Sequence, residues 1–339
     1  MRGVGRLRFW LMAAVLGAGM AATQPARAET GEVRIARHYT LTELPLMVIE
    51  KRKLIEKHAA AVGLASVKVQ WMAPGKTGAI DTLLAGEADL ATVAPGHFII
   101  AWDRKLGSPQ DMRALAALSR IPYVLVSRNP AVQTIRDFSE QDRIAVPALK
   151  TSDPALFIEM AAAQEWGPEH FDKLDPLVRG RSDAEAAYDL LDGKSDLNAH
   201  FSRSPYTDDE LGNPAVHRVM DSFDIAGPHS DELLVGPVKF HEANPKLCAA
   251  IFAALQDADE AIRKNPGEAA EMFVAMVGNK EISVEDFTDM IGDPDFSYEV
   301  APAGIGRLAD FIAAVKRIKH KPESWKDLFF SDAQATPGS

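Results

Sequence analysis

The sequence contains almost no cysteine and fewer basic than acidic residues. Its 339 residues include one cysteine, Cys248, and 37 Lys+Arg against 48 Asp+Glu, which gives a formal net charge of −11. A single cysteine excludes an intramolecular disulfide and a cysteine-based zinc cluster. The acidic balance argues against nucleic acid or an anionic membrane as a partner, because both bind basic surfaces.

Common catalytic and nucleotide-binding motifs are also missing. The chain has no Gly-x-Gly-x-x-Gly after a strand, no complete phosphate loop, no Gly-x-Ser-x-Gly elbow and no His-Glu-x-x-His. Its histidines are not spaced as metal ligands. Cys248 lies between Leu247 and Ala249 in an expected helix, which is typical of a small core residue. The sequence therefore predicts no catalytic residue, no metal and no cofactor.

The first 28 residues have the parts of a secretory signal peptide in the usual order. Arg2, Arg6 and Arg8 precede an apolar run from Phe9 to Ala22, and residues 26–28 form a small-x-small cleavage site. The run is shorter than the roughly 20 residues of a membrane anchor. Removing this segment, which holds four arginines and no acid, changes the net charge to −15. We expect cleavage after Ala28 and an untethered periplasmic protein.

After residue 28, strand-like and helix-like segments alternate, which predicts α/β layers with parallel strands. Strands are expected at 33–37, 67–72, 88–94, 123–127, 143–146, 176–178 and 197–201, and helices at 41–62, 79–85, 96–106, 155–166 and 184–191. Beyond about residue 240 the pattern is mostly helical, with Pro245 and Pro266 each opening a helix. Residues 331–339 are expected to form a flexible tail.

A weak internal repeat supports two similar lobes. Residues 83–90 (LLAGEADL) resemble residues 190–197 (LLDGKSDL), and in both a helix stops at glycine before a strand begins. The chain is long enough for two lobes with separate cores. In such α/β layers, ligands bind at the carboxyl ends of the strands, here in a cleft between the lobes.

Polar, small or cationic residues follow several of the expected strands. The candidate ligand-binding residues are Arg37, His38, Tyr39, Lys76, Thr77, Gly96, His97, Lys150, Thr151, Ser152, His200 and Arg203. Several precede helix N-termini, where free N–H groups favour an anion, although Thr77 and Ser152 could equally be ordinary N-caps. Cationic loops in an acidic protein predict a small anionic or zwitterionic ligand. Tyr39 or Phe201 could stack on a planar ligand or simply pack.

Several segments, taken in their order along the chain, resemble one family of transport proteins. They are residues 83–90, residues 143–147 (RIAVP), the stretch from Phe240 through Asn244-Pro245 into an Ala-rich helix, residues 265–270 and residues 325–330 (WKDLFF). The chain resembles the periplasmic substrate-binding proteins of ABC importers, in the nitrate/sulfonate/taurine branch. The resemblance implies the two-lobed type II α/β fold, with a mixed sheet flanked by helices in each lobe and a ligand cleft between them.

The resemblance also implies how the parts are used. Lobe one would comprise 29–120 and 227–330, and lobe two 121–226. The hinge would lie at the two crossovers, near Arg120, Ile121, Pro122, Asp224 and Gly227. A monomer would capture a small molecule by hinge closure and deliver it to the transmembrane subunits of an ABC permease. The binding residues of nitrate and sulfonate binders do not map onto this chain by motif, so only the positions of the loops carry over.

Three alternatives remain open on the sequence alone. The ligand could be a planar pyrimidine or thiamine precursor, which some members of this branch bind. A related enzyme of thiamine-pyrimidine synthesis would need a crowded His/Cys/Lys site, and the export signal argues against it. A sensory input module would need a membrane or signalling segment, and none follows residue 330.

Overall fold

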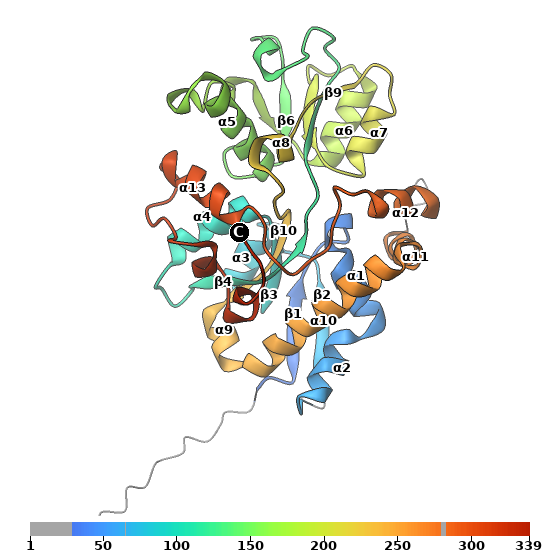
Figure 1. Cartoon of the computed structure of the whole chain (residues 1–339), viewed down its shortest axis with the longest axis vertical. Coiled ribbons are helices and arrows are strands. Elements are labelled where there is room, and N and C mark those ends of the chain that lie inside the picture. Colours follow the sequence, from blue (N-terminus) through green and yellow to red (C-terminus); the bar gives the residue numbers. More distant parts are fainter. Residues whose placement is uncertain (1–28, 65, 279–282) are drawn as a thin grey trace, which may run out of the picture.

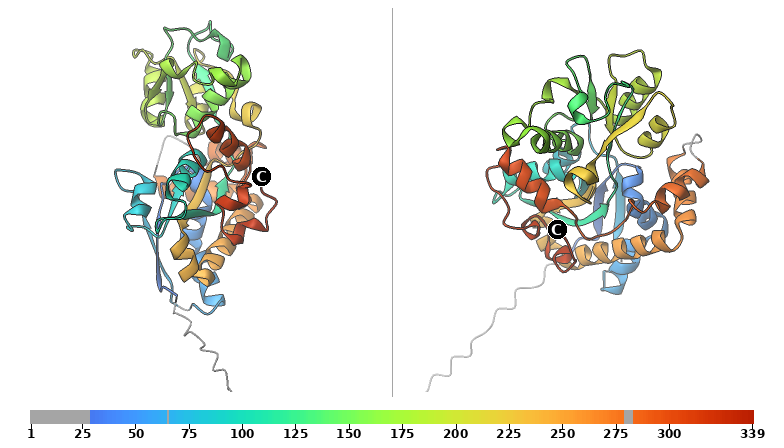
Figure 2. Two further views of the ribbon diagram at one scale, coloured as in Figure 1. Left: turned by 90° about the vertical axis from the view of Figure 1, so that its left-hand side faces the viewer. Right: turned by 45° about the horizontal axis from the view of Figure 1, so that its top comes forward.

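Two five-stranded mixed sheets, each flanked by helices, divide the molecule into two lobes (Figure 1). The computed structural model describes residues 29–339 except 65 and 279–282, so the predicted signal peptide at 1–28 lies outside the described residues. Lobe one is the sheet of order β2-β1-β3-β10-β4 with its helices, and lobe two is the sheet of order β7-β6-β8-β5-β9 with its helices. Figure 2 shows the two lobes one above the other.

The sheet of lobe one is built from two separate stretches of chain. Its strands are β1 (Glu32–Ala36), β2 (Lys68–Met72), β3 (Leu90–Val93), β4 (Met112–Ser119) and β10 (Glu232–Pro237). β1 pairs in parallel with β2 and β3, whereas β10 runs antiparallel between β3 and β4. The helices among these strands are α1 (Leu44–Arg52), α2 (Leu54–Ala61), α3 (Ala79–Leu84) and α4 (Pro95–Lys105).

The sheet of lobe two repeats this arrangement within one continuous stretch. Its strands are β5 (Val124–Ser127), β6 (Ile144–Val146), β7 (Val178–Gly180), β8 (Ala199–Ser202) and β9 (His217–Asp221). β6 pairs in parallel with β7 and β8, and β5 runs antiparallel between β8 and β9. The helices of this stretch are α5 (Asp153–Trp166), α6 (Asp183–Asp192), α7 (Tyr206–Leu211) and α8 (Ser222–Ala226).

The C-terminal third returns to lobe one and is mostly helical, as its sequence predicts. It contains α9 (Val238–Ala243), α10 (Pro245–Lys264), α11 (Pro266–Val277), α12 (Val284–Gly292), α13 (Ile305–Ala314) and α14 (Ser331–Gln334). The long helix α10 packs on α1 and α2, and α13 packs on α4 (Figure 1). Cys248 lies on the buried face of α10, where burial raises the pKa of its thiol. None of the described helices combines the length and apolar character needed to span a membrane.

Residues 331–339 differ from the flexible tail that their sequence predicts. They contain α14, and Ala333 is fully buried. The backbone N–H of Ile305 donates to the carbonyl of Ser339, and the Ser339 N–H donates to the carbonyl of Pro302. These long-range bonds fix the segment on lobe one, and a local reading of its small polar residues could not foresee them.

The chain crosses between the lobes twice, from β4 to β5 and from α8 to β10. The two crossovers lie side by side, because the N–H of Asp231 donates to the carbonyl of Ser119 (2.9 Å). Of the predicted hinge residues, Arg120, Ile121 and Pro122 lie in the first crossover, Gly227 begins the second, and Asp224 lies in α8 just before it.

Candidate functional site

A cavity of about 370 Å³ lies between the lobes, where strands of both sheets end. Lobe two supplies two of its lining residues and lobe one the rest. The lining residues are His38, Thr77, Gly78, Ala79, Ile80, Thr92, Val93, Ala94, His97, Pro147, Arg203 and Glu232. This is the edge at which α/β sheets commonly place ligands. The lining contains no Phe, Tyr or Trp, so a planar ligand would find only imidazole rings to stack on.

Four of the predicted binding residues line this cavity: His38, Thr77, His97 and Arg203. The hydroxyl of Thr151, a fifth predicted residue, lies 2.8 Å from His97 Nε2 and joins the two lobes. Burial lowers the pKa of both His38 and His97, and the charge of Arg203 adds to the effect on His38. Both imidazoles are therefore suited to neutral hydrogen bonding rather than to holding an anion by charge.

Arg37 and Tyr39 are not among the lining residues. The Arg37 side chain is fully buried and pairs with Glu50 of α1. Its guanidinium lies over two rings, 4.1 Å from the centroid of Tyr39 and 4.7 Å from that of Trp71. Tyr39 therefore covers Arg37. Phe201, the other aromatic candidate, is fully buried in the core of lobe two.

The predicted residues on the other loops also lie outside the lining. Lys76 is exposed, and Lys150 Nζ lies 3.8 Å from Asp175. The hydroxyl of Ser152 donates to the carbonyl of Ala148. The expected convergence of cations on the cleft is thus reduced to one guanidinium, that of Arg203.

Gly96 is a point of close approach between the lobes. Its N–H, in the first turn of α4, donates to Asp153 Oδ1 of α5 (2.7 Å). A Cβ at this position would lie 2.5 Å from both Asp153 Oδ1 and Leu156 Cδ1. Only glycine therefore allows the first turns of α4 and α5 to meet in this way.

His200 was expected in the cleft, but it is fully buried inside lobe two. Its Nδ1 lies 2.6 Å from Glu210 Oε1, and its Nε2 lies 3.6 Å from Asp183 Oδ1. Although burial lowers the pKa of His200, the nearby carboxylates of Asp183 and Glu210 raise it to about 9. His200 is therefore an internal cation that holds α6 and α7 to β8.

Buried carboxyl groups around Arg203 are the part of the site that sequence reasoning missed. Arg203 Nη1 lies 2.7 Å from both oxygens of Asp231 and 3.0 Å from the hydroxyl of Tyr123. The acids within electrostatic reach of Arg203 are Glu43, Asp153, Asp183, Asp231 and Glu232. Burial raises the pKa of Glu43 to about 7 and that of Asp153 to about 8. Of these acids only Glu232 lines the cavity, and only Asp153 adjoins a loop that the sequence had singled out.

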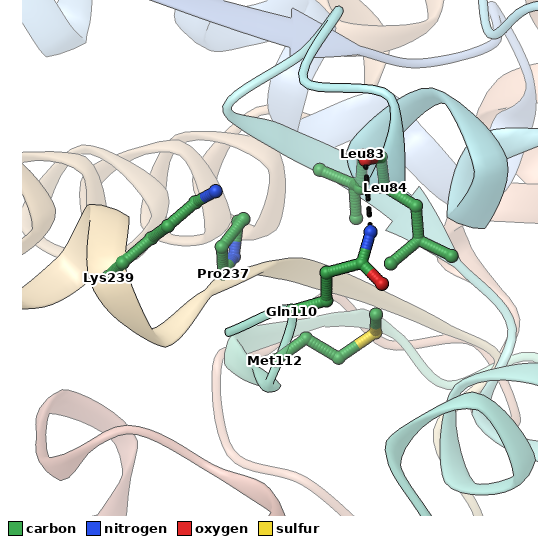
Figure 3. A pocket seen from close by; sticks show the side chains of 6 residues that line it. All are labelled: Leu83, Leu84, Gln110, Met112, Pro237 and Lys239. Atoms are coloured by element: carbon green, nitrogen blue, oxygen red, sulfur yellow. Dashed lines mark hydrogen bonds between the residues drawn. The ribbon is translucent and has the colours of Figure 1, made fainter. Parts of the chain in front are cut away.

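A second cavity, of about 20 Å³, lies at the opposite end of β10, lined by Leu83, Leu84, Gln110, Met112, Pro237 and Lys239 (Figure 3). The Gln110 amide donates to the Leu84 carbonyl at its edge. This volume has room for little more than one water, so it is not a solute site.

The sequence matches no protein-family model and no curated protein. Solved structures do match. The alkanesulfonate-binding protein SsuA from Xanthomonas axonopodis pv. citri aligns with a TM-score of 0.68 at 14% identity, over 89% of this chain and 99% of that one. The chain has the periplasmic binding-protein fold. The periplasmic aliphatic sulphonate-binding protein SsuA from Escherichia coli gives 0.66 at 15% identity, over 92% and 96% of the two chains.

A third structure of this fold is the periplasmic nitrate-binding protein NrtA from Synechocystis PCC 6803. It has a TM-score of 0.63 at 14% identity, over 88% of this chain and 85% of that one. The predicted two-lobed α/β periplasmic binding-protein fold is therefore confirmed. All three similar structures are described as binding proteins.

Proposed function

We propose that this protein is the extracytoplasmic solute-binding component of an ABC importer. It captures a small anionic or zwitterionic organic solute between its lobes and delivers it to the transmembrane subunits of a permease. The observation that carries this proposal is the cavity of about 370 Å³ lined from both lobes. Its position at the strand ends of a periplasmic binding-protein fold supports a role in capture rather than in chemistry.

Four side chains form the proposed binding set: His38, Thr77 and His97 from lobe one and Arg203 from lobe two. Thr151 acts through His97. Arg203 belongs to lobe two and the other three residues to lobe one, so a solute that bonds to both sets stabilises the closed arrangement.

The remaining parts of the proposal are the cleavage site, lobe boundaries and hinge predicted from the sequence. Cleavage after Ala28 would release a monomer into the periplasm. The lobe boundaries would be 29–120 with 227–330 for lobe one and 121–226 for lobe two. Closure would bend the chain at the crossovers, near Arg120, Ile121, Pro122, Asp224 and Gly227.

A thermal-shift screen of purified residues 29–339 tests this function. The compounds are sulfonates, carboxylates, nitrate, amino acids, betaines and pyrimidines. A ligand at one hundred times its Kd adds about 2.7 kcal/mol to the free energy of unfolding. We expect a shift with one anionic or zwitterionic class, and no shift with any class would contradict the proposal.

A matched pair of variants locates the site. Arg203→Lys keeps the charge opposite Asp231 but removes the planar donor fork, so binding should weaken at least tenfold. Arg104→Lys, on the exposed end of α4, should bind as the wild type does. Equal affinities for the two variants would remove Arg203 from the binding set.

A further inference from the structure

Glu232 is a buried acid on the cavity wall that has no hydrogen-bond donor. It begins β10, it is 8% exposed, and it lines the cavity. Within the described residues, no donor bonds to its carboxylate. Asp231 instead pairs with Arg203, and Asp153 accepts the N–H of Gly96. Glu232 therefore differs from its acidic neighbours in facing the cavity without a partner.

Glu43 lies behind this wall, and one of its oxygens has no donor among the described residues. It is 1% exposed; Oε1 accepts the hydroxyl of Thr92, while Oε2 is enclosed without a partner. Thr92 lines the cavity, and it is opposite Leu234 of β10 in the register of the sheet. Glu43 and Glu232 interact electrostatically. Two buried carboxyl groups thus adjoin one face of the cavity.

The side chains that act on Glu232 include more acids than cations. Glu43, Asp231 and Asp153 act on it from the surrounding elements, and the charge of Arg203 opposes them. The Arg203 charge is already shared with Asp231 and Asp183. Burial, followed by the neighbouring acids, raises the pKa of Glu232. A cationic group in the cavity would relieve this imbalance.

We propose that Glu232 binds a cationic nitrogen of the solute, so that the solute is a zwitterion and not a simple anion. This inference rests on the proposed solute-binding function. The nitrogen faces Glu232 of lobe one while the anionic group faces Arg203 of lobe two. Glu43 is a positioning residue that acts through Thr92 and the local field. The two charges of one solute thus connect the two lobes.

Paired probes that differ only in the nitrogen test this inference. The pairs are 2-aminoethanesulfonate with ethanesulfonate and 3-aminopropanoate with propanoate, titrated by calorimetry into residues 29–339. We expect the amine-bearing member to bind at least tenfold more tightly in one pair. If the nitrogen-free member binds equally well or better, the inference is overturned and the proposed function stands. If neither pair binds, the ligand found in the thermal-shift screen decides: one with a cationic nitrogen supports the inference, and one without it overturns the inference while the proposed function stands. If neither pair binds and the screen finds no ligand, the proposed function fails with it.

Neutral substitutions then assign the effect to residues. Glu232→Gln keeps the shape but removes the charge, so the preference for the amine member should fall at least tenfold. Glu43→Gln retains an acceptor for Thr92 and should lower the same preference by a smaller factor. Glu242→Gln, on exposed α9, is the control and should change nothing. An unchanged preference in Glu232→Gln, with melting temperature preserved, would overturn the assignment.

Discussion

The two lobes share one backbone plan, and their central strands begin in the same way. In lobe one the N–H of Arg34 donates to Asp89 Oδ2 (2.8 Å), and the N–H of Asp89 donates back to the Arg34 carbonyl (2.9 Å). In lobe two the N–H of Arg143 donates to Asn198 Oδ1 (2.8 Å), and the N–H of Asn198 returns to the Arg143 carbonyl (3.2 Å). The Asp89 carboxylate in lobe one and the Asn198 amide in lobe two therefore accept equivalent backbone hydrogen bonds.

The lobes differ where their strands reach the cavity. Lobe one brings the buried acids Glu43 and Glu232, whereas lobe two brings Arg203. Two residues after the strand starts at Asp89 and Asn198, lobe one has Ala91 and lobe two has the buried cation His200, at equivalent places in the register of the two sheets. The shared topology fixes where side chains can meet a solute, and the individual residues fix the chemistry.

The largest effect should come from the ion pair that ties the lobes together. Asp231→Ala leaves Arg203 largely buried without its partner, so the free energy of unfolding should fall by about 3–5 kcal/mol in urea. The double variant Arg203→Met/Asp231→Leu removes both charges and should recover most of the loss. A double variant as unstable as the single would show that the cost is lost packing and not an orphaned charge.

The second effect is a pH dependence confined to lobe two. The pKa of His200 is raised in the folded state to about 9, from an ordinary value of 6.5. Its contribution is therefore fully present below pH 6.5 and is lost as the pH rises through 9. The difference in stability between wild type and His200→Gln should shrink by a few kcal/mol over this interval, as followed by urea unfolding. A pH-independent difference would contradict a charged His200.

Asp89→Asn and Asn198→Asp, which exchange the residue types that precede β3 and β8, should lower the free energy of unfolding by unequal amounts. Asn198→Asp places a carboxylate against Asp142 Oδ1, to which the Asn198 amide now donates at 2.7 Å, and should cost about 1–3 kcal/mol. Asp89→Asn loses only a partly exposed pair with Arg34 and should cost at most about 1 kcal/mol. Equal losses in thermal unfolding would mean that the two positions are not distinguished by their neighbours.

The smallest effect separates the two glycines of the internal repeat. Gly86 and Gly193 both have positive φ, 71° and 66°, so alanine costs about 1 kcal/mol at either position. A Cβ at Gly193 would also lie 2.8 Å from the guanidinium of Arg128, whereas nothing lies within 4 Å at Gly86. Gly193→Ala should therefore melt lower than Gly86→Ala. The reverse order would show that Arg128 moves aside freely.

Of the ten strands in the described part of the chain, the sequence predicted seven, although its segment 176–178 overlaps β7 only at Val178. It did not predict β4, β9 or β10. β4 reads MRALAALS, in which Ala and Leu favour a helix. It is a strand because it pairs with β10, which arrives more than 100 residues later. β10 is buried along most of its length, so it lacks the alternation that marks a strand with one solvated face.

The candidate site could be predicted only in part. His38, Thr77, His97 and Arg203 were predicted because each follows an expected strand, and that position can be read from the local sequence. It also selected Arg37, whose partner Glu50 is supplied by the following helix. Glu43 and Glu232 are 189 residues apart in the sequence. They come within electrostatic range only when β10 inserts between β3 and β4, so no local sequence pattern marks them.

The position of β10 also bears on the order in which the chain can fold. Its place between β3 and β4 means that β4 lacks its neighbour in the sheet until residue 237 has been made. All five strands of lobe two, by contrast, lie within residues 124–221. In a chain synthesised from its N-terminus, lobe two can assemble first while the earlier-made strands of lobe one wait for β10. The half-built edges of β3 and β4 are then the surfaces most exposed to mispairing, and Glu232 is among the last residues needed to complete the cavity wall.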